Sequence, residues 1–87
     1  MDDFSGLKKQ LDLLEWPGLY FFKFISPTKD ELIKKIISHF DEKSEVHLKA
    51  SKNGTFTSIS IKEIMFSSED VISIYKEIGQ IKGVIIL

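Results

Sequence analysis

The sequence predicts an α+β sandwich in which two helices cover one face of a four-stranded antiparallel sheet. One observation is a hairpin pattern: two arms of alternating apolar and polar residues, 45–51 and 58–62, flank Asn53-Gly54. Both turn residues suit the positive φ angles of a primed hairpin turn. The other observation is the order of periodic segments, which reads strand, helix, strand, strand, helix, strand. Because crossovers are right-handed, this order predicts the ferredoxin-like split βαβ fold, βαββαβ, with both helices on one face.

The composition is that of one small globular domain. Its 87 residues, 43% hydrophobic and 11% aromatic, are enough for a core that needs no disulfide. The absence of cysteine excludes thiolate metal sites and thiol nucleophiles. Every basic residue is lysine and the net charge is −1, so the usual electrostatic signature of a nucleic-acid binder is missing. No signal-peptide pattern or apolar run of about 20 residues is visible, and we expect a soluble cytoplasmic protein.

The first 18 residues are expected to form a helix and its stop, preceding the ferredoxin-like domain of residues 19–87. Leucines at i, i+4 and i+7 predict a short helix over residues 4–15, with Ser5 as its cap. Pro17 then ends the helix, because proline disfavours helical geometry in the residue before it.

The strands should bury one alternating set of side chains each. In the aromatic segment 20–26, the set that lacks Lys23 is expected to face the helices. The expected inward residues of the sheet are Tyr20, Phe22, Phe24, Leu48, Ile59 and Ile61. The uninterrupted aliphatic run 84–87 predicts a last strand that is central or buried on both sides.

Local signals predict where the two main helices begin and end. Thr28 and Glu31 have the spacing of a capping box at the start of the first. Its apolar stripe comprises Leu32, Ile33, Ile36, Ile37 and Phe40. Ser67 or Ser68 should cap the second, and Gly79 suits the left-handed position just past its end.

Few residues suggest catalysis or metal binding. The only histidines, His39 and His47, lie on a helix and a strand without the spacing of a metal site. Ser58 and Ser60 share a face with His47, but no nucleophile motif accompanies them. We therefore expect a protein that is not an enzyme, with no catalytic residue, no cofactor and no metal ion.

The sheet face opposite the helices is the candidate functional surface. It should carry Phe21, Lys23, His47, Lys49, Ser51, Phe56, Ser58 and Ser60. Aromatic anchors with a polar surround are typical of protein interfaces. The leading expectation is a regulatory or adaptor module that binds another protein or itself.

Two alternatives stay open, a small-metabolite sensor and an RNA-binding domain. RNA-recognition domains stack bases on aromatic residues of their central strands, and Phe21 and Phe56 would be candidates. Ser58 stands where a second aromatic residue of the third strand is expected, so nucleic acid is the less favoured partner. We expect no membrane partner.

Several motifs resemble the YbeD-like family of small bacterial proteins of unknown function. They are Glu15-Trp16-Pro17, the first strand through Lys23, the pattern Lys49-x-Ser51-x-x-Gly54-x-Phe56-x-Ser58-Ile59-Ser60, and Tyr75-x-x-Ile78-Gly79. The resemblance covers nearly the whole chain. It implies the same ferredoxin-like fold, similar to ACT-type regulatory domains that bind small metabolites or associate side by side. It brings no catalytic residues. This chain differs in having Asn53 before the glycine and a more aromatic first strand.

Overall fold

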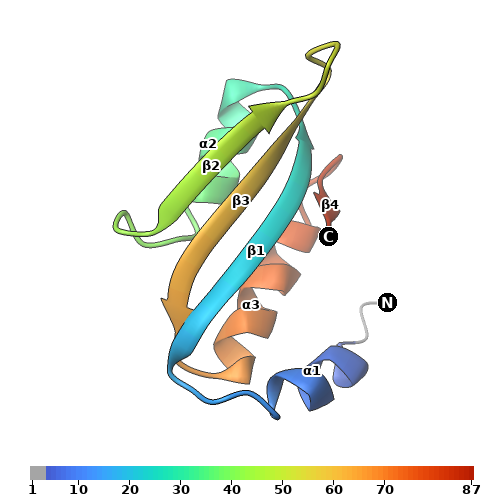
Figure 1. Ribbon diagram of the computed structural model, residues 1–87. Helices are drawn as coiled ribbons and strands as arrows, with labels where there is room; N and C mark the ends of the chain where they lie inside the picture. Colours follow the sequence, from blue (N-terminus) through green and yellow to red (C-terminus); the bar gives the residue numbers. More distant parts are fainter. Residues whose placement is uncertain (1–3) are drawn as a thin grey trace.

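The computed structural model describes residues 4–87, which form three helices and one four-stranded antiparallel sheet (Figure 1). The elements are α1 (Ser5–Leu11), β1 (Gly18–Pro27), α2 (Asp30–Ile37), β2 (Glu45–Ala50), β3 (Phe56–Met65), α3 (Ser68–Gly79) and β4 (Ile85–Ile86). The strand order across the sheet is β2-β3-β1-β4, and α2 and α3 lie behind the sheet in Figure 1. The predicted α+β, ferredoxin-like sandwich is confirmed.

The two central strands, β1 and β3, pair along ten residues each. Side chains that lie opposite each other in such a ladder point to the same face. Phe22 lies opposite Ile61 and Phe24 opposite Ile59, and each of the four is at most 1% exposed. The predicted inward set of the central strands is therefore correct.

The core is built around the ring of Phe22. Its centroid lies 4.8 Å from that of Tyr20 and 5.0 Å from that of Phe40, which follows α2. It also lies 5.5 Å from the ring of Tyr75 on α3. Edge-to-face contacts of this kind stabilise a core beyond the area that they bury. One side chain thus joins the sheet to α3 and to the segment that follows α2.

Tyr75 makes the core sensitive to high pH. Its side chain is 5% exposed, and burial raises the pKa of the Tyr75 hydroxyl, with a further contribution from the Tyr20 hydroxyl at 3.1 Å. The unfolded chain then loses this proton first, near pH ~10. Below that pH the hydroxyl is neutral in both the folded and the unfolded chain, so its full contribution to the free energy of unfolding is present. We expect the free energy of unfolding to fall above it, by about 1.4 kcal/mol per pH unit from this group.

Urea unfolding between pH ~8 and ~11.5 measures this slope, and Tyr75→Phe is its control. That variant keeps every other titrating group, so its free energy of unfolding should fall less steeply with pH. Equal slopes for the two proteins would contradict the assignment to Tyr75.

Helix α1 is shorter than the leucine spacing predicts. It ends at Leu11, and Ser5 is its first residue rather than its cap, since Phe4 occupies the cap position. The carbonyl of Leu11 accepts hydrogen bonds from the Leu14 backbone N–H at 3.0 Å and from the Trp16 Nε1–H at 3.0 Å. These bonds satisfy the acceptor that another helical turn needs, so the chain leaves the helix here.

The capping box predicted for α2 is also wrong. Lys29 is the cap residue, and its side chain makes no capping hydrogen bond. The hydroxyl of Thr28 lies instead 2.8 Å from the hydroxyl of Thr57 on β3. A bond to a distant strand has replaced the local bond that the spacing to Glu31 suggests.

Helix α3 begins as predicted and ends differently. Ser67 caps it, because its hydroxyl accepts a hydrogen bond from the Asp70 backbone N–H at 3.1 Å. Gly79 is the last helical residue and has no positive φ; that conformation occurs at Gly83, where φ is +89°. The chain continues in a turn past Gly79 because Ile81 is buried against the core.

The β2–β3 hairpin reverses over residues 51–55, a longer loop than the predicted two-residue turn. Gly54 has a φ of +75°, whereas Asn53 has no positive φ. The side-chain amide oxygen of Asn53, Oδ1, accepts hydrogen bonds from the Ser51 hydroxyl at 3.0 Å and from the Thr55 backbone N–H at 3.1 Å. Asn53 therefore organises the loop through its side chain and not through its backbone.

The outer strands are less covered than predicted. Leu48 lies opposite Ile59 and so on the helical side, but it is 52% exposed because β2 is an edge strand. Strand β4 is neither central nor buried on both sides. It is the other edge strand, pairs only with Phe24 and Ile25 of β1, and leaves Ile85 half exposed.

Candidate functional site

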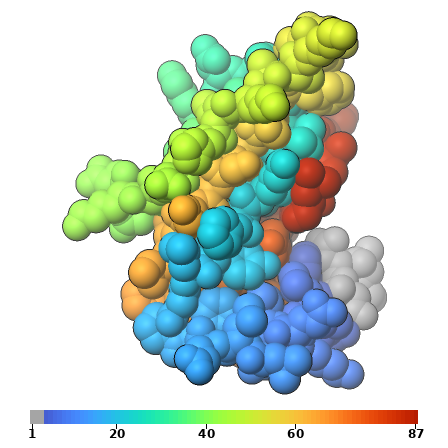
Figure 2. Space-filling model, in the orientation of Figure 1, coloured from blue at the N-terminus to red at the C-terminus, as the bar shows by residue number. Residues whose placement is uncertain are grey.

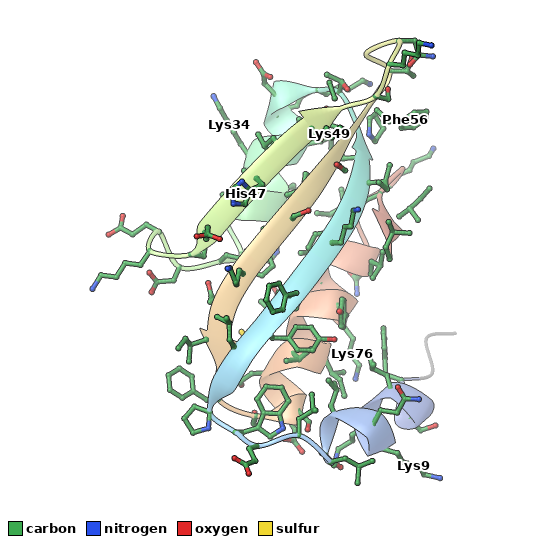
Figure 3. The ribbon with its side chains drawn as sticks, viewed as in Figure 1. Lys9, Lys34, His47, Lys49, Phe56 and Lys76 are labelled. Atoms are coloured by element: carbon green, nitrogen blue, oxygen red, sulfur yellow. The ribbon has the colours of Figure 1, made fainter. Side chains whose placement is uncertain are left out.

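Within residues 4–87, no helix covers the sheet face opposite α2 and α3, which we call the open face (Figures 1 and 2). The ladder register places seven of the predicted site residues on it: Phe21, Lys23, His47, Lys49, Phe56, Ser58 and Ser60. Ser51 lies in the adjoining hairpin loop. Figure 3 shows His47 and Lys49 along β2, with Phe56 near the hairpin loop.

The middle of the open face is polar. Ser60 lies between His47 on one side and Lys23 on the other. In the next row, Ser58 lies opposite Lys49 and donates a hydrogen bond to its backbone carbonyl at 3.3 Å. Neither Lys23 nor Lys49 forms an ion pair with any of the residues that the structure describes. These two ammonium groups are available to a partner.

A charged cluster of Glu45, His47 and Lys62 lies beside the ring of Phe21. The Lys62 Nζ is 3.1 Å from Glu45 Oε2 and 5.4 Å from the centroid of the Phe21 ring. The His47 Nε2 is 3.4 Å from the same carboxylate oxygen. The hydrogen bond from Lys62 is the main reason that the pKa of the Glu45 carboxyl is lowered, and His47 adds to the effect. The carboxylate is thus held as an anion between two cationic or polar partners.

The same contact bears on catalysis. His47 faces Glu45, and among residues 4–87 no hydrogen bond joins it to Ser58 or Ser60. A serine nucleophile needs a base within hydrogen-bond reach. The described residues also contain no group of three or more histidine or acidic side chains placed to hold a metal ion. The arrangement is suited to binding through charge and apolar contact.

The open face extends beyond the residues that the sequence predicts for it. Leu19 and Ile64 lie opposite each other on it, one row beyond Phe21, and all three are more than half exposed. Phe66 follows β3 and is exposed as well. Period-two alternation continued from Phe21 back to Leu19, and from Lys62 on to Ile64, could have identified two of these residues.

A second apolar area lies at the opposite end of the open face. Ile85 pairs with Ile25, and the exposed Leu87 donates its backbone N–H to the Lys23 carbonyl at 3.0 Å. Phe56 lies opposite Pro27 at the same end. The open face therefore has apolar residues at both ends and lysine, histidine and serine between them.

The two aromatic side chains are far apart. Phe56 is opposite Pro27, six residues along β1 from Phe21, which corresponds to about 20 Å at ~3.4 Å per residue. The ammonium group of Lys62 also lies over the Phe21 ring. Adjacent bases of one strand therefore cannot stack on both rings together.

Comparisons with known proteins give the following matches. The family model described as "Protein of unknown function (DUF493)" matches residues 12–87. A UPF0250 protein of Vibrio vulnificus strain YJ016 is 34% identical over 77 residues, which cover 84% of each chain, and one from strain CMCP6 gives the same values. A UPF0250 protein of Haemophilus ducreyi is 29% identical over 84 residues, covering 87% of this chain and 82% of that protein. No solved structure gives a significant match.

In the part of the chain that the structure describes, no helix is long and apolar enough to cross a membrane.

Proposed function

This chain belongs to the DUF493 family of proteins of unknown function, as its resemblance to YbeD-like proteins predicted, and we propose that it is a non-enzymatic adaptor or regulatory module that binds another protein through the open face. The observation that carries the proposal is the exposure of large apolar side chains at both ends of this one surface. The side chain of Phe21, for example, is 67% exposed although the residue lies within the central strand β1.

The chemistry of the open face supports a protein partner. Exposed groups of large apolar side chains bordered by polar residues mark interaction sites on monomeric proteins. Aromatic residues supply most of the binding energy in such interfaces, and Phe21 and Phe56 are placed to do so. Lys23 and Lys49 lie between them without ion pairs among residues 4–87, and they can select a partner by its charge.

The proposal predicts that the double variant Lys49→Ser/Phe56→Ser folds normally and loses its partner. Capture of partner protein from lysate by the tagged chain, quantified by mass spectrometry, should fall by more than about tenfold, because an aromatic anchor and a cation are removed together. Size-exclusion chromatography of the pure protein shows whether the partner is a second copy.

The matched control is Lys34→Ser/Leu48→Ser. It removes one lysine and one exposed apolar side chain from the helical side of the molecule, as Figure 3 shows for Lys34. This control should keep the wild-type set of captured proteins. Unchanged capture by the Lys49→Ser/Phe56→Ser variant, or an equal loss in the control, would count against the open face.

A second candidate function is the sensing of a small metabolite, as in ACT-like domains. It is favoured by a groove of about 540 Å³ at one end of the sheet, which combines Leu19, Ile64 and Phe66 with charged side chains. Ligand pockets have volumes of this order. Thermal-shift measurements with amino acids and nucleotides separate the two candidates: a saturating rise in Tm supports the sensor, and no rise across the panel removes it.

A further inference from the structure

The ion pair between Glu45 and Lys62 lies between two hollows, one on the open face and one at the end of the sheet beside the α2–β2 connection. The larger, of about 540 Å³, is lined on its apolar side by Leu19, Ile64 and Phe66 and on its charged side by Asp41, Lys43 and Glu63. The smaller, of about 260 Å³, is lined by residues that include Phe21, His47 and Ser60. Glu45 and Lys62 line both, so an elongated ligand that fills the two hollows has to pass over this pair.

Glu45 shows what kind of group this position accepts. One oxygen of its carboxylate lies 3.1 Å from Lys62 Nζ and 3.4 Å from His47 Nε2. Glu45 and His47 are exposed and Lys62 is partly exposed, and ion pairs that are open to solvent contribute little to stability. Another carboxylate can therefore take the place of Glu45 at a small cost in free energy. In the free protein, the chain's own side chain occupies the position.

The distribution of charge indicates the sign of the partner. On the strands, the open face carries Lys23, Lys49 and Lys62 against one acid, Glu45, which is two net positive charges. The whole chain has a net charge of −1, so the remaining residues carry three net negative charges. A second copy docked face to face would bring like charges together, whereas the carboxylates of an acidic partner would be attracted to the lysines of the strands. Asp41 and Glu63 line the larger hollow, so the acidic side chains of the partner have to lie over the strands and its apolar side chains over that hollow.

We infer that the open face binds an acidic segment of another protein, with one Asp or Glu side chain replacing Glu45 on Lys62 and His47. Apolar side chains of the same segment fill the larger hollow against Leu19, Ile64 and Phe66. The inference rests on the proposed function and adds the chemistry of the partner. Glu45 then competes with the carboxylate of the partner for Lys62 and His47, so a segment has to be acidic enough to displace Glu45.

The test uses a short fluorescein-labelled peptide of alternating Glu and Leu, measured by fluorescence anisotropy at low salt. The isosteric peptide of alternating Gln and Leu should bind about tenfold more weakly, because it lacks the charge-assisted hydrogen bonds. Glu45→Gln should tighten binding of the acidic peptide by about threefold to fivefold, and Lys62→Gln should weaken it by at least as much.

Glu77→Gln is the matched control for charge. It removes a carboxylate that also lies beside a histidine, His39 at 3.3 Å, but on the helical side of the molecule. This variant should bind the acidic peptide as the wild type does. Far-UV circular dichroism establishes that each variant is folded.

Every outcome decides between the alternatives. Absence of binding by the acidic peptide, or equal binding of the two peptides, overturns the inference. If the Gln peptide binds equally well and Phe21→Ser abolishes that binding, the open face remains an interface and only the acidic partner is wrong. If neither peptide binds and Lys49→Ser/Phe56→Ser also leaves capture unchanged, the proposed function fails as well. Tighter binding of oligo-deoxythymidine than of the acidic peptide would identify a nucleic-acid partner instead.

Discussion

Replacing Phe22 with alanine should destabilise the protein by about 3–5 kcal/mol, a large part of the stability of a domain of this size. The side chain is 1% exposed, and its ring contacts those of Tyr20, Phe40 and Tyr75. Its removal leaves a cavity at the point where the sheet meets α3 and the segment that follows α2. Urea unfolding at 25 °C, followed by circular dichroism, measures the change in the free energy of unfolding.

The neighbouring Phe21 provides the control. Phe21→Ala deletes the same atoms one residue earlier on β1, but from the open face, where the ring is 67% exposed. This variant should lose less than about 1 kcal/mol, in the range of surface substitutions. Similar losses in the two variants would show that the faces of β1 are assigned wrongly.

The second large effect is expected on β3. Ile61→Asp should prevent folding, because it places an unpaired carboxylate in the core opposite Phe22 and Val46. Ser60→Asp, one residue earlier, places the same carboxylate on the open face between Lys23 and His47. We expect the stability of this variant to change by no more than about 0.5 kcal/mol.

Far-UV circular dichroism and thermal unfolding distinguish the two variants directly. A cooperative transition near the wild-type Tm is expected for Ser60→Asp alone. If Ile61→Asp melts like the wild type, or if Ser60→Asp is unfolded, the alternation of β3 is reversed.

The central part of the fold could be predicted because a charged or polar residue within each central strand indicates which face of that strand points to solvent. Lys23 excludes its alternating set from the core, and Ser60 does the same on β3. Because β1 and β3 pair along ten residues each, the orientation of one residue fixes the orientation of every residue in both strands. The same alternation brought the predicted site residues together on the open face. The prediction does not extend the alternation to Leu19 and Ile64, so it lacks one apolar end of the open face.

The predictions that failed depend on contacts that the local sequence pattern does not show. Thr28 bonds to Thr57, and Trp16 bonds to the Leu11 carbonyl, so neither helix end follows its local pattern. The exposure of Leu48 and Ile85 depends on which strands lie at the edges of the sheet. An alternating or aliphatic run is the same in an edge strand and a central strand, so the local sequence does not distinguish them.

The register of the sheet also has a consequence for how the chain folds. The β2–β3 ladder closes from Ala50 and Thr57, seven residues apart, whereas the β1–β3 ladder begins with Pro27 and Phe56, 29 residues apart. Closing the longer loop costs about 1 kcal/mol more in chain entropy. The hairpin can therefore form locally and early. The longest and most buried ladder of the domain has to wait until α2 and β2, which lie between its two strands, bring them together.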